Sequence, residues 1–139
     1  MRYIGLDVGD RRIGVAVSDV TGLIASAVGN ITRGDEDYEG DLQKTADEIK
    51  RLNAEHIVIG LPKNMNGTIG PRAELVQQFA EDLKRYTDLP ISFWDERLTT
   101  VAAEKMMIQA GVRRDKRKQK VDRVAATFIL QDFLDFSRR

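Results

Sequence analysis

The chain has 139 residues, of which 22 are basic and 22 acidic, with no cysteine and a single histidine, His56. A chain of this length can bury enough surface to fold as one domain without disulfides or metal staples. The lack of cysteine excludes disulfides, thiolate zinc sites and a cysteine nucleophile, and it fits a reducing cytoplasm.

The first part of the sequence predicts three consecutive strands. Apolar residues alternate with other residues over 2–8 and again over 13–17, and the turn-prone pair Gly9-Asp10 between them predicts a hairpin. A third strand is expected over about 23–31. These strands should form an antiparallel meander, because short turns connect them.

The remaining elements alternate between helices and strands, which is typical of an α/β fold with right-handed crossovers. In chain order they are a helix over about 42–52, an apolar strand at 56–61, a loop at 62–70, a helix from Pro71, a strand at 91–94, a helix at 99–110 and a final helix from Val121. The basic segment 111–120 is interpreted as the connection between the last two helices. We expect one domain over residues 1–139.

Three acidic residues that are distant in the sequence are expected to meet. Asp7 lies near the end of the first strand, Glu96 follows the last strand, and Asp122 lies in the first turn of the expected last helix. If the first, fourth and fifth strands are parallel neighbours, the first two acids share the edge where ligand sites form in α/β sheets. The last helix should return Asp122 to that edge.

Strand spacing leaves room for metal ions among these acids. With one strand between them, the backbones that carry Asp7 and Glu96 are ~10 Å apart, and paired metal ions lie ~3.5–4 Å apart. Converging carboxylates repel one another unless a cation lies between them, and ligand sets made only of oxygen suit Mg²⁺ or Mn²⁺. Such ions activate water against a phosphodiester. We therefore predict a metal-dependent nuclease site at Asp7, Glu96 and Asp122.

Basic and polar residues near this edge are expected to bind nucleic acid. Residues 111–120 carry six basic residues and one acid, although the net charge of the chain is zero. For Arg12 and Arg97 two roles stay open, phosphate contact or neutralisation of the acids. The residues expected to contact substrate are Arg12, Lys63, Asn64, Thr68, Arg97, Arg113, Arg114, Lys116, Arg117, Lys118 and Lys120.

Four sequence blocks closely resemble the YqgF family. They are residues 5–9 with 12–19, residues 60–62 with Met65, Gly67-Thr68 and Gly70, residues 95–100, and Lys120-Val121-Asp122 with 125–126 and 129–131. The resemblance implies a ribonuclease H-like fold, a mixed five-stranded sheet in the order 3-2-1-4-5 flanked by helices. It also implies Asp7, Glu96 and Asp122 as catalytic acids of a nuclease that trims the 5′ end of pre-16S ribosomal RNA. Related junction resolvases carry a fourth acid where this chain has Ala125.

Alternative functions remain open at this stage. Members of the family are also called Holliday junction resolvase-like, so a DNA endonuclease is one alternative, and a non-catalytic nucleic-acid-binding factor is another. Asp7-Val8-Gly9 also fits the phosphate turn of sugar-kinase or actin-like ATPases, which usually need two domains. We expect a cytoplasmic monomer or weak homodimer that binds pre-16S rRNA or the small-subunit precursor. Because the sequence has no signal-peptide pattern and no apolar run of ~20 residues, we expect no membrane association.

Overall fold

The computed structural model of the protein describes residues 1–98 and 114–138, apart from the side chains of 114–124. The elements are β1 (Tyr3–Val8), β2 (Arg12–Ser18), β3 (Ala25–Thr32), α1 (Tyr38–Arg51), β4 (His56–Leu61), α2 (Pro71–Leu83), β5 (Ile91–Asp95), the 3-10 turn η1 (Glu96–Leu98) and α4 (Arg114–Ser137). The strands and the helix from Pro71 therefore form where the sequence predicts them, within one or two residues at each end. The expected helix at 99–110 lies outside the described residues.

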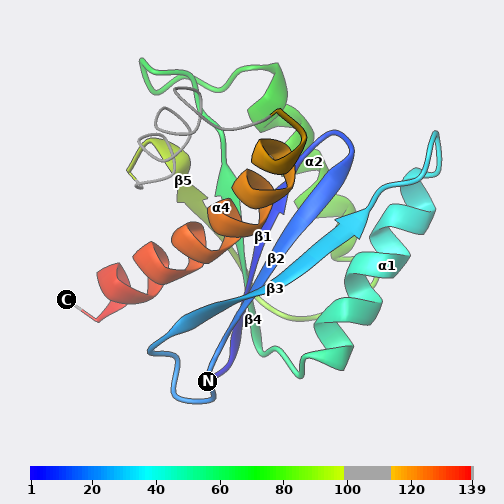
Figure 1. The fold of residues 1–139 in the computed structure, drawn as a ribbon. Coiled ribbons are helices and arrows are strands. Elements are labelled where there is room, and N and C mark those ends of the chain that lie inside the picture. Colours follow the sequence, from blue (N-terminus) through cyan, green and yellow to red (C-terminus); the bar gives the residue numbers. More distant parts are fainter. Residues whose placement is uncertain (99–113, 139) are drawn as a thin grey trace.

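The five strands form one mixed sheet in the order β3-β2-β1-β4-β5, as the family resemblance implied (Figure 1). The meander pairs are antiparallel, whereas β1 pairs with β4 and β4 with β5 in parallel. The carboxyl ends of β1, β4 and β5 therefore meet at one edge. Asp7 and Glu96 are carried to this edge, as the sequence predicts.

Helices cover both faces of the sheet, and alternation within β1 divides the two cores. Ile4, Leu6 and Val8 belong to the core beneath α1 and α2. The opposite face packs against α4, which crosses the sheet in Figure 1. Gly5 faces α4, and a Cβ at this position would lie only 2.7 Å from Cβ of Leu130. The glycine thus lets the helix approach the sheet closely.

The start of α4 differs from the sequence prediction. The helix begins at Arg114 instead of Val121, so most of the basic segment is helical. The physical reason is that arginine, lysine and glutamine are good helix formers, and their charges conceal this preference when the segment is interpreted as a loop. Asp122 consequently lies more than two turns inside α4, so the prediction that it occupies the first turn of the helix is wrong.

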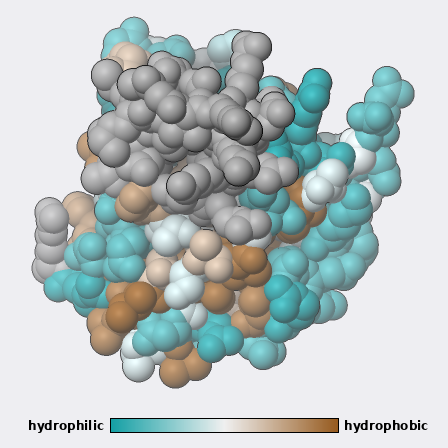
Figure 2. Space-filling view, in the orientation of Figure 1, coloured by the Kyte–Doolittle hydropathy of each residue, from teal (hydrophilic) through white to brown (hydrophobic). Residues whose placement is uncertain are grey.

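The surface differs between the two sides of the view in Figure 2. Hydrophilic side chains cover α1, which carries four of the seven acidic residues between positions 34 and 48, and hydrophobic side chains gather over β3 and the neighbouring part of α4. Leu23, Ile24 and Val28 are among the exposed apolar residues. Within the described parts of the chain, none of the helices has the length and apolar character needed to cross a membrane.

Candidate active site

Asp7 lies on the face of the sheet that α4 covers, between two glycines. Its partner in β2 is Gly14. The parallel register of β1 with β4 pairs Leu6 with Ile59, so the next step places Gly60 beside Asp7. Paired residues of neighbouring strands point to the same face. Because neither glycine has a side chain, the half-buried Asp7 carboxylate is not crowded from the adjoining strands.

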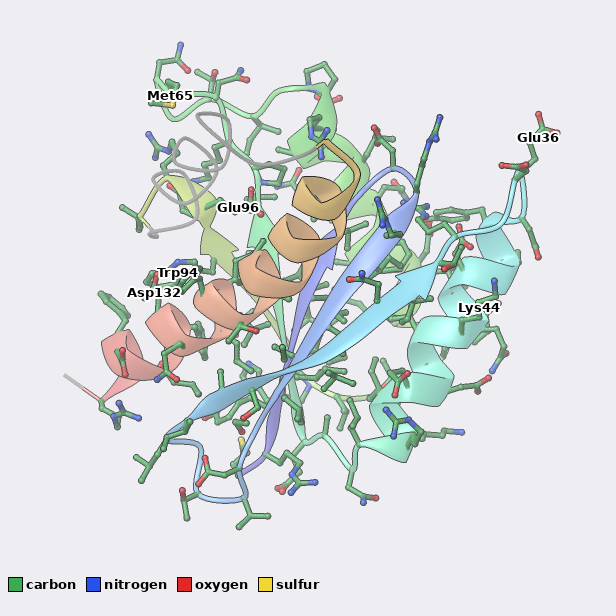
Figure 3. All side chains as sticks on the ribbon, viewed as in Figure 1. Glu36, Lys44, Met65, Trp94, Glu96 and Asp132 are labelled. Atoms are coloured by element: carbon green, nitrogen blue, oxygen red, sulfur yellow. The ribbon has the colours of Figure 1, made fainter. Side chains whose placement is uncertain are left out.

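Glu96 turns back over Gly60 from the end of β5. A Cβ built on Gly60 would lie 2.8 Å from Oε1 of Glu96 and 2.5 Å from Cδ1 of Ile129 in α4. The Glu96 carboxylate therefore lies on the same face as Asp7, above the neighbouring strand. Figure 3 shows Glu96 at the strand ends, beside α4. Adjacent strands are ~4.8 Å apart, so the two acids share one small region of the sheet edge.

The register of α4 against β1 relates position 122 to this region. The ring of Tyr3 lies 5.9 Å from that of Phe133, whereas Gly5 lies against Ala126 and Leu130. Residue numbers in α4 thus fall as β1 advances toward Asp7, which means that the two elements are antiparallel. Two strand residues advance ~6.6 Å and one helical turn ~5.4 Å. Position 122, one turn before Ala126, is therefore level with Asp7, while its side chain lies outside the described residues.

The donor atoms fit a hard divalent cation. Asp7 and Glu96 offer only carboxylate oxygens, the ligand type preferred by Mg²⁺ and Mn²⁺. Among the residues with described side chains, no group of three histidines, cysteines or acids is close enough to hold a metal. Asp122, the third expected ligand, is not among those residues. Two neighbouring carboxylates on a covered sheet face favour a bound cation, because it offsets their repulsion.

One polar residue in this region was missed by the sequence prediction. Asn30 in β3 pairs with Gly14, so Asn30, Gly14, Asp7, Gly60 and Trp94 form one row across the sheet. The Asn30 Oδ1 atom is buried without a hydrogen-bond partner in the described structure. Alternation within residues 23–31 could not have shown it, because a β-bulge between Ala27 and Gly29 reverses the parity and places Ala27 and Asn30 on the same face. A buried unpaired oxygen needs an explanation.

Arg97 binds the neighbouring aspartate and the β4–α2 loop. Its Nη2 atom donates to Asp95 at 2.6 Å, and Nη1 donates to the backbone oxygen of Met65 at 3.3 Å. The Arg97 hydrogen bond holds the pKa of Asp95 below its usual value, and Lys63, 4.0 Å from the same carboxylate, acts in the same direction. Arg97 thus neutralises Asp95, and its two expected roles, phosphate contact and neutralisation of the catalytic acids, stay predictions. The pair fixes η1 and with it the backbone of Glu96.

The loop after β4 is held together by its own polar side chains. Nδ2 of Asn64 donates to Oγ1 of Thr68 at 3.0 Å, and that hydroxyl donates to Oδ1 of Asn66 at 2.6 Å. The backbone N–H of Gly67 closes the turn by donating a 2.8 Å hydrogen bond to the backbone oxygen of Asn64. Asn64 and Thr68 are exposed, and Met65 projects from the tip with 89% of its surface exposed. The loop thus forms a stiff projection at the edge that carries Glu96 (Figure 3).

Other expected substrate-contact residues that the structure describes lie around the same edge. Arg12 precedes Gly14 by two residues in β2, so it shares the face of Asp7. Arg114, Lys116, Arg117, Lys118 and Lys120 belong to the first turns of α4, where side chains are outside the described set. Arg113 lies outside the described residues altogether. His56 forms a hydrogen bond with Ser92 and its ring packs at a tilt against that of Tyr3, which is a structural role.

Comparison of the sequence with known proteins finds one matching family and relatives that share one name. The family model described as "RuvX: Holliday junction resolvase" matches residues 1–136. A protein of Bacillus cereus strain B4264, named "Putative pre-16S rRNA nuclease", is 50% identical over 135 residues, which cover 97% of this chain and 98% of that protein. A protein of Bacillus mycoides strain KBAB4 with the same name is also 50% identical over 135 residues, with the same coverage.

Solved structures agree on the fold. Thermus thermophilus RuvC in complex with a Holliday junction substrate superimposes with a TM-score of 0.61 at 13% identity, covering 99% of this chain and 95% of that chain. The fowlpox virus Holliday junction resolvase gives a TM-score of 0.56 at 14% identity, covering 98% and 99%. These likenesses confirm the expected ribonuclease H-like fold. With the family match over residues 1–136 and 50% identity to its curated relatives, the chain is a member of the RuvX family, also called YqgF.

Proposed function

We propose that this protein is a metal-dependent nuclease that hydrolyses phosphodiester bonds during 5′-end maturation of pre-16S ribosomal RNA in the cytoplasm. The observation that carries the proposal is the meeting of Asp7 and Glu96 on one face of the sheet, above neighbouring strands and beside two glycines. The names of the 50% identical relatives support the RNA substrate.

Each described residue has a distinct part in the proposed reaction. Asp7 and Glu96, with Asp122, would hold Mg²⁺ or Mn²⁺, which lowers the pKa of water and stabilises the leaving oxygen when bound. The bare surface of Gly14 and Gly60 leaves room beside the carboxylates. The Asp95–Arg97 pair keeps η1 in place, so that Glu96 is oriented before substrate arrives. Preorganised positions of this kind reduce the cost of aligning the reactants.

Positive charge around the edge supplies substrate attraction in this proposal. Arg12 shares the face of Asp7, and residues 114–120 of the basic segment occupy the first turns of α4, level with or beyond the expected metal site. Contacts to phosphate are independent of base sequence and weaken with salt. Replacing Lys118 by glutamine should therefore weaken binding across sequences and lower the slope of log affinity against log salt by ~1.

A Holliday junction resolvase is the second candidate function, because the matching family model carries that description. A resolvase that cuts two symmetric strands would normally act as a two-fold dimer. The test compares an extended 16S rRNA 5′ end with a four-way DNA junction, each incubated with the full chain and Mn²⁺. We expect cleavage of the RNA.

Two aspartate variants make this test specific. Asp7→Asn removes one proposed ligand carboxylate, whereas Asp88→Asn removes an exposed carboxylate elsewhere and is the matched control. We expect Asp7→Asn to abolish cleavage and to weaken Mn²⁺ binding, measured by loss of the free-ion electron paramagnetic resonance signal. The Asp88→Asn protein should match the parent in both measurements. Full cleavage by the Asp7→Asn protein would refute the catalytic assignment, and preferential cutting of the junction would refute the RNA substrate.

A further inference from the structure

A recess lies at the same edge of the sheet but on the opposite face from the carboxylates. Its volume is about 250 Å³, and it lies between the end of β1 and the starts of α1 and α2. Val8 contributes to its floor, and Val8 is the residue directly after Asp7. Because successive side chains of a strand point to opposite faces, the recess and the proposed active site flank the end of one strand. A nucleic-acid strand that passes over this end can reach both.

Aromatic, aliphatic and guanidinium groups form the walls of the recess. Tyr38 is 37% exposed, and its ring packs in a T-shaped arrangement against that of Phe79, with ring centroids 6.2 Å apart. The Arg33 guanidinium lies 5.7 Å from the Phe79 centroid. Leu75 extends the apolar surface to the mouth, where 67% of its surface is exposed. Aromatic rings and guanidinium planes are the surfaces on which proteins stack unpaired bases.

The walls are fixed in place by hydrogen bonds. Arg33 donates from Nε to Asp41 at 2.9 Å and from Nη1 to the Gly9 oxygen at 2.8 Å. The Tyr38 hydroxyl donates to Asp82 at 2.6 Å, and burial, together with this bond, raises the pKa of the phenol. Both groups are thus already oriented, which reduces the entropy lost when a ligand is ordered against them.

The charges favour an uncharged group inside the recess and phosphate outside it. The Arg33 charge is balanced by the buried Asp41 carboxylate, so the interior offers no uncompensated cation for a phosphate. Arg72, 64% exposed and 3.9 Å from the exposed Asp10, lies at the rim in the first turn of α2. The volume is below the ~300–1,000 Å³ of pockets for drug-sized ligands, which suits one planar ring system.

We propose that this recess holds one unpaired nucleobase of the substrate strand, stacked on Tyr38 beside Arg33, while Arg72 contacts the adjoining phosphate. This inference rests on the proposed nuclease function and adds a base-binding subsite to it. The subsite stacks any base, because every base has a flat face. It would make the enzyme prefer a substrate whose strand is unpaired close to the cleaved bond.

The experiment measures binding in the Asp7→Asn protein, so that cleavage cannot interfere. Single-stranded RNA of 12 nucleotides is titrated in two forms, one complete and the other abasic at a single position that is moved along the strand. We expect one or two abasic positions to weaken binding at least fivefold, the lower end of the effect of base–aromatic stacking. A free nucleoside monophosphate, titrated in parallel, shows whether a single nucleotide suffices.

Variants assign the effect to the recess. Tyr38→Ala should remove the difference between complete and abasic RNA, whereas Tyr38→Phe should keep it, because the ring remains. Leu75→Asp places a negative charge at the mouth and should weaken binding of the complete strand. Gln77→Asp adds the same charge to an exposed position of α2 outside the recess and is the matched control. Thermal unfolding of each variant shows that it is folded.

The outcomes separate this inference from the proposed function. Equal affinity for complete and all abasic strands overturns the subsite but leaves the nuclease proposal intact. A base effect that survives in the Tyr38→Ala and Leu75→Asp proteins places the base elsewhere and also overturns it. If the protein binds no RNA at low salt, the proposed function itself fails. Saturation by the free nucleoside monophosphate with no effect of abasic positions would assign the recess to a small ligand and refute a strand-binding role.

Discussion

Replacing Gly60 by alanine should displace the Glu96 carboxylate. The added Cβ would lie 2.8 Å from Oε1 of Glu96, and ordinary contact begins at 3.4 Å, so the oxygen must move by 3.4 − 2.8 = 0.6 Å or more. Misplacement of a reacting group by about 1 Å can cost ~100-fold in rate, so a shift of this size should reduce cleavage about tenfold. The same Cβ would lie 2.5 Å from Cδ1 of Ile129, which adds strain of about 1–3 kcal/mol.

A second substitution separates the two effects. Ile129→Val removes the Cδ1 atom, so the double variant Gly60→Ala/Ile129→Val relieves the clash with α4 and keeps the one with Glu96. The measurements are the single-turnover cleavage rate with saturating Mn²⁺ and unfolding by urea. We expect the double variant to regain stability relative to Gly60→Ala while its cleavage rate stays low.

A matched control introduces a clash with the same helix, α4, at a position that does not touch Glu96. Gly5→Ala places a Cβ 2.7 Å from Cβ of Leu130, again between the sheet and α4. It should destabilise the protein by a similar amount and reduce the cleavage rate less than Gly60→Ala does. If the double variant folds normally and cleaves at the parental rate, the inferred position of Glu96 over Gly60 has no part in catalysis, and the assignment of Glu96 fails.

Three further predictions concern stability. Burial lowers the pKa of His56 below its usual value of 6.5. As pH falls through 6.5, the unfolded chain therefore takes up a proton before the folded protein does, and the free energy of unfolding decreases. Between pH 7 and 5 the His56→Phe variant should lose less of this free energy than the parent protein, as measured by urea unfolding. The Arg97 hydrogen bond lowers the pKa of Asp95 below its usual value of 3.8. The stability that this pair contributes is therefore complete above pH 3.8 and is lost as pH falls through the lower pKa of the folded protein. Asp95→Asn should make the free energy of unfolding depend less on pH in this acid range, and an unchanged dependence would contradict the pairing. Asp41, 3% exposed, bonds to Arg33, so Asp41→Ala should cost about 3–5 kcal/mol of unfolding free energy, and a loss under about 1 kcal/mol would contradict the structure.

Much of the fold follows from local patterns in the sequence. Alternation in 2–8 and 13–17, the apolar run at 57–61 and Pro71 at the start of α2 each specify an element without reference to the rest of the chain. The start of α4 was predicted seven residues too late, at Val121 instead of Arg114. A dense run of charge looks like a solvated loop, although the same residue types favour helix, so local pattern alone could not decide between them.

Some features of the candidate site could also be predicted from the sequence, and others could not. Asp7 at the end of its strand and Glu96 just after another could be identified from the sequence, because parallel strands bring their carboxyl ends to one edge. The sequence could not show which acid Arg97 neutralises, because Asp95 and Glu96 are adjacent and only the direction of η1 separates them. The unpaired oxygen of Asn30 was likewise hidden until strand register placed it beside Gly14.

The sequence by itself determined which residues could carry the chemistry and the order of the elements that hold them. Tertiary structure decided what surrounds each group: the glycines on both sides of Asp7, the folding of Glu96 over Gly60, and the recess behind Val8. The physical reason is the range of the interactions. Strand and helix preference depend on neighbours within a few residues. Room for a side chain depends instead on strand register and on how closely α4 packs against the sheet, and both are determined by residues that are far apart in the chain.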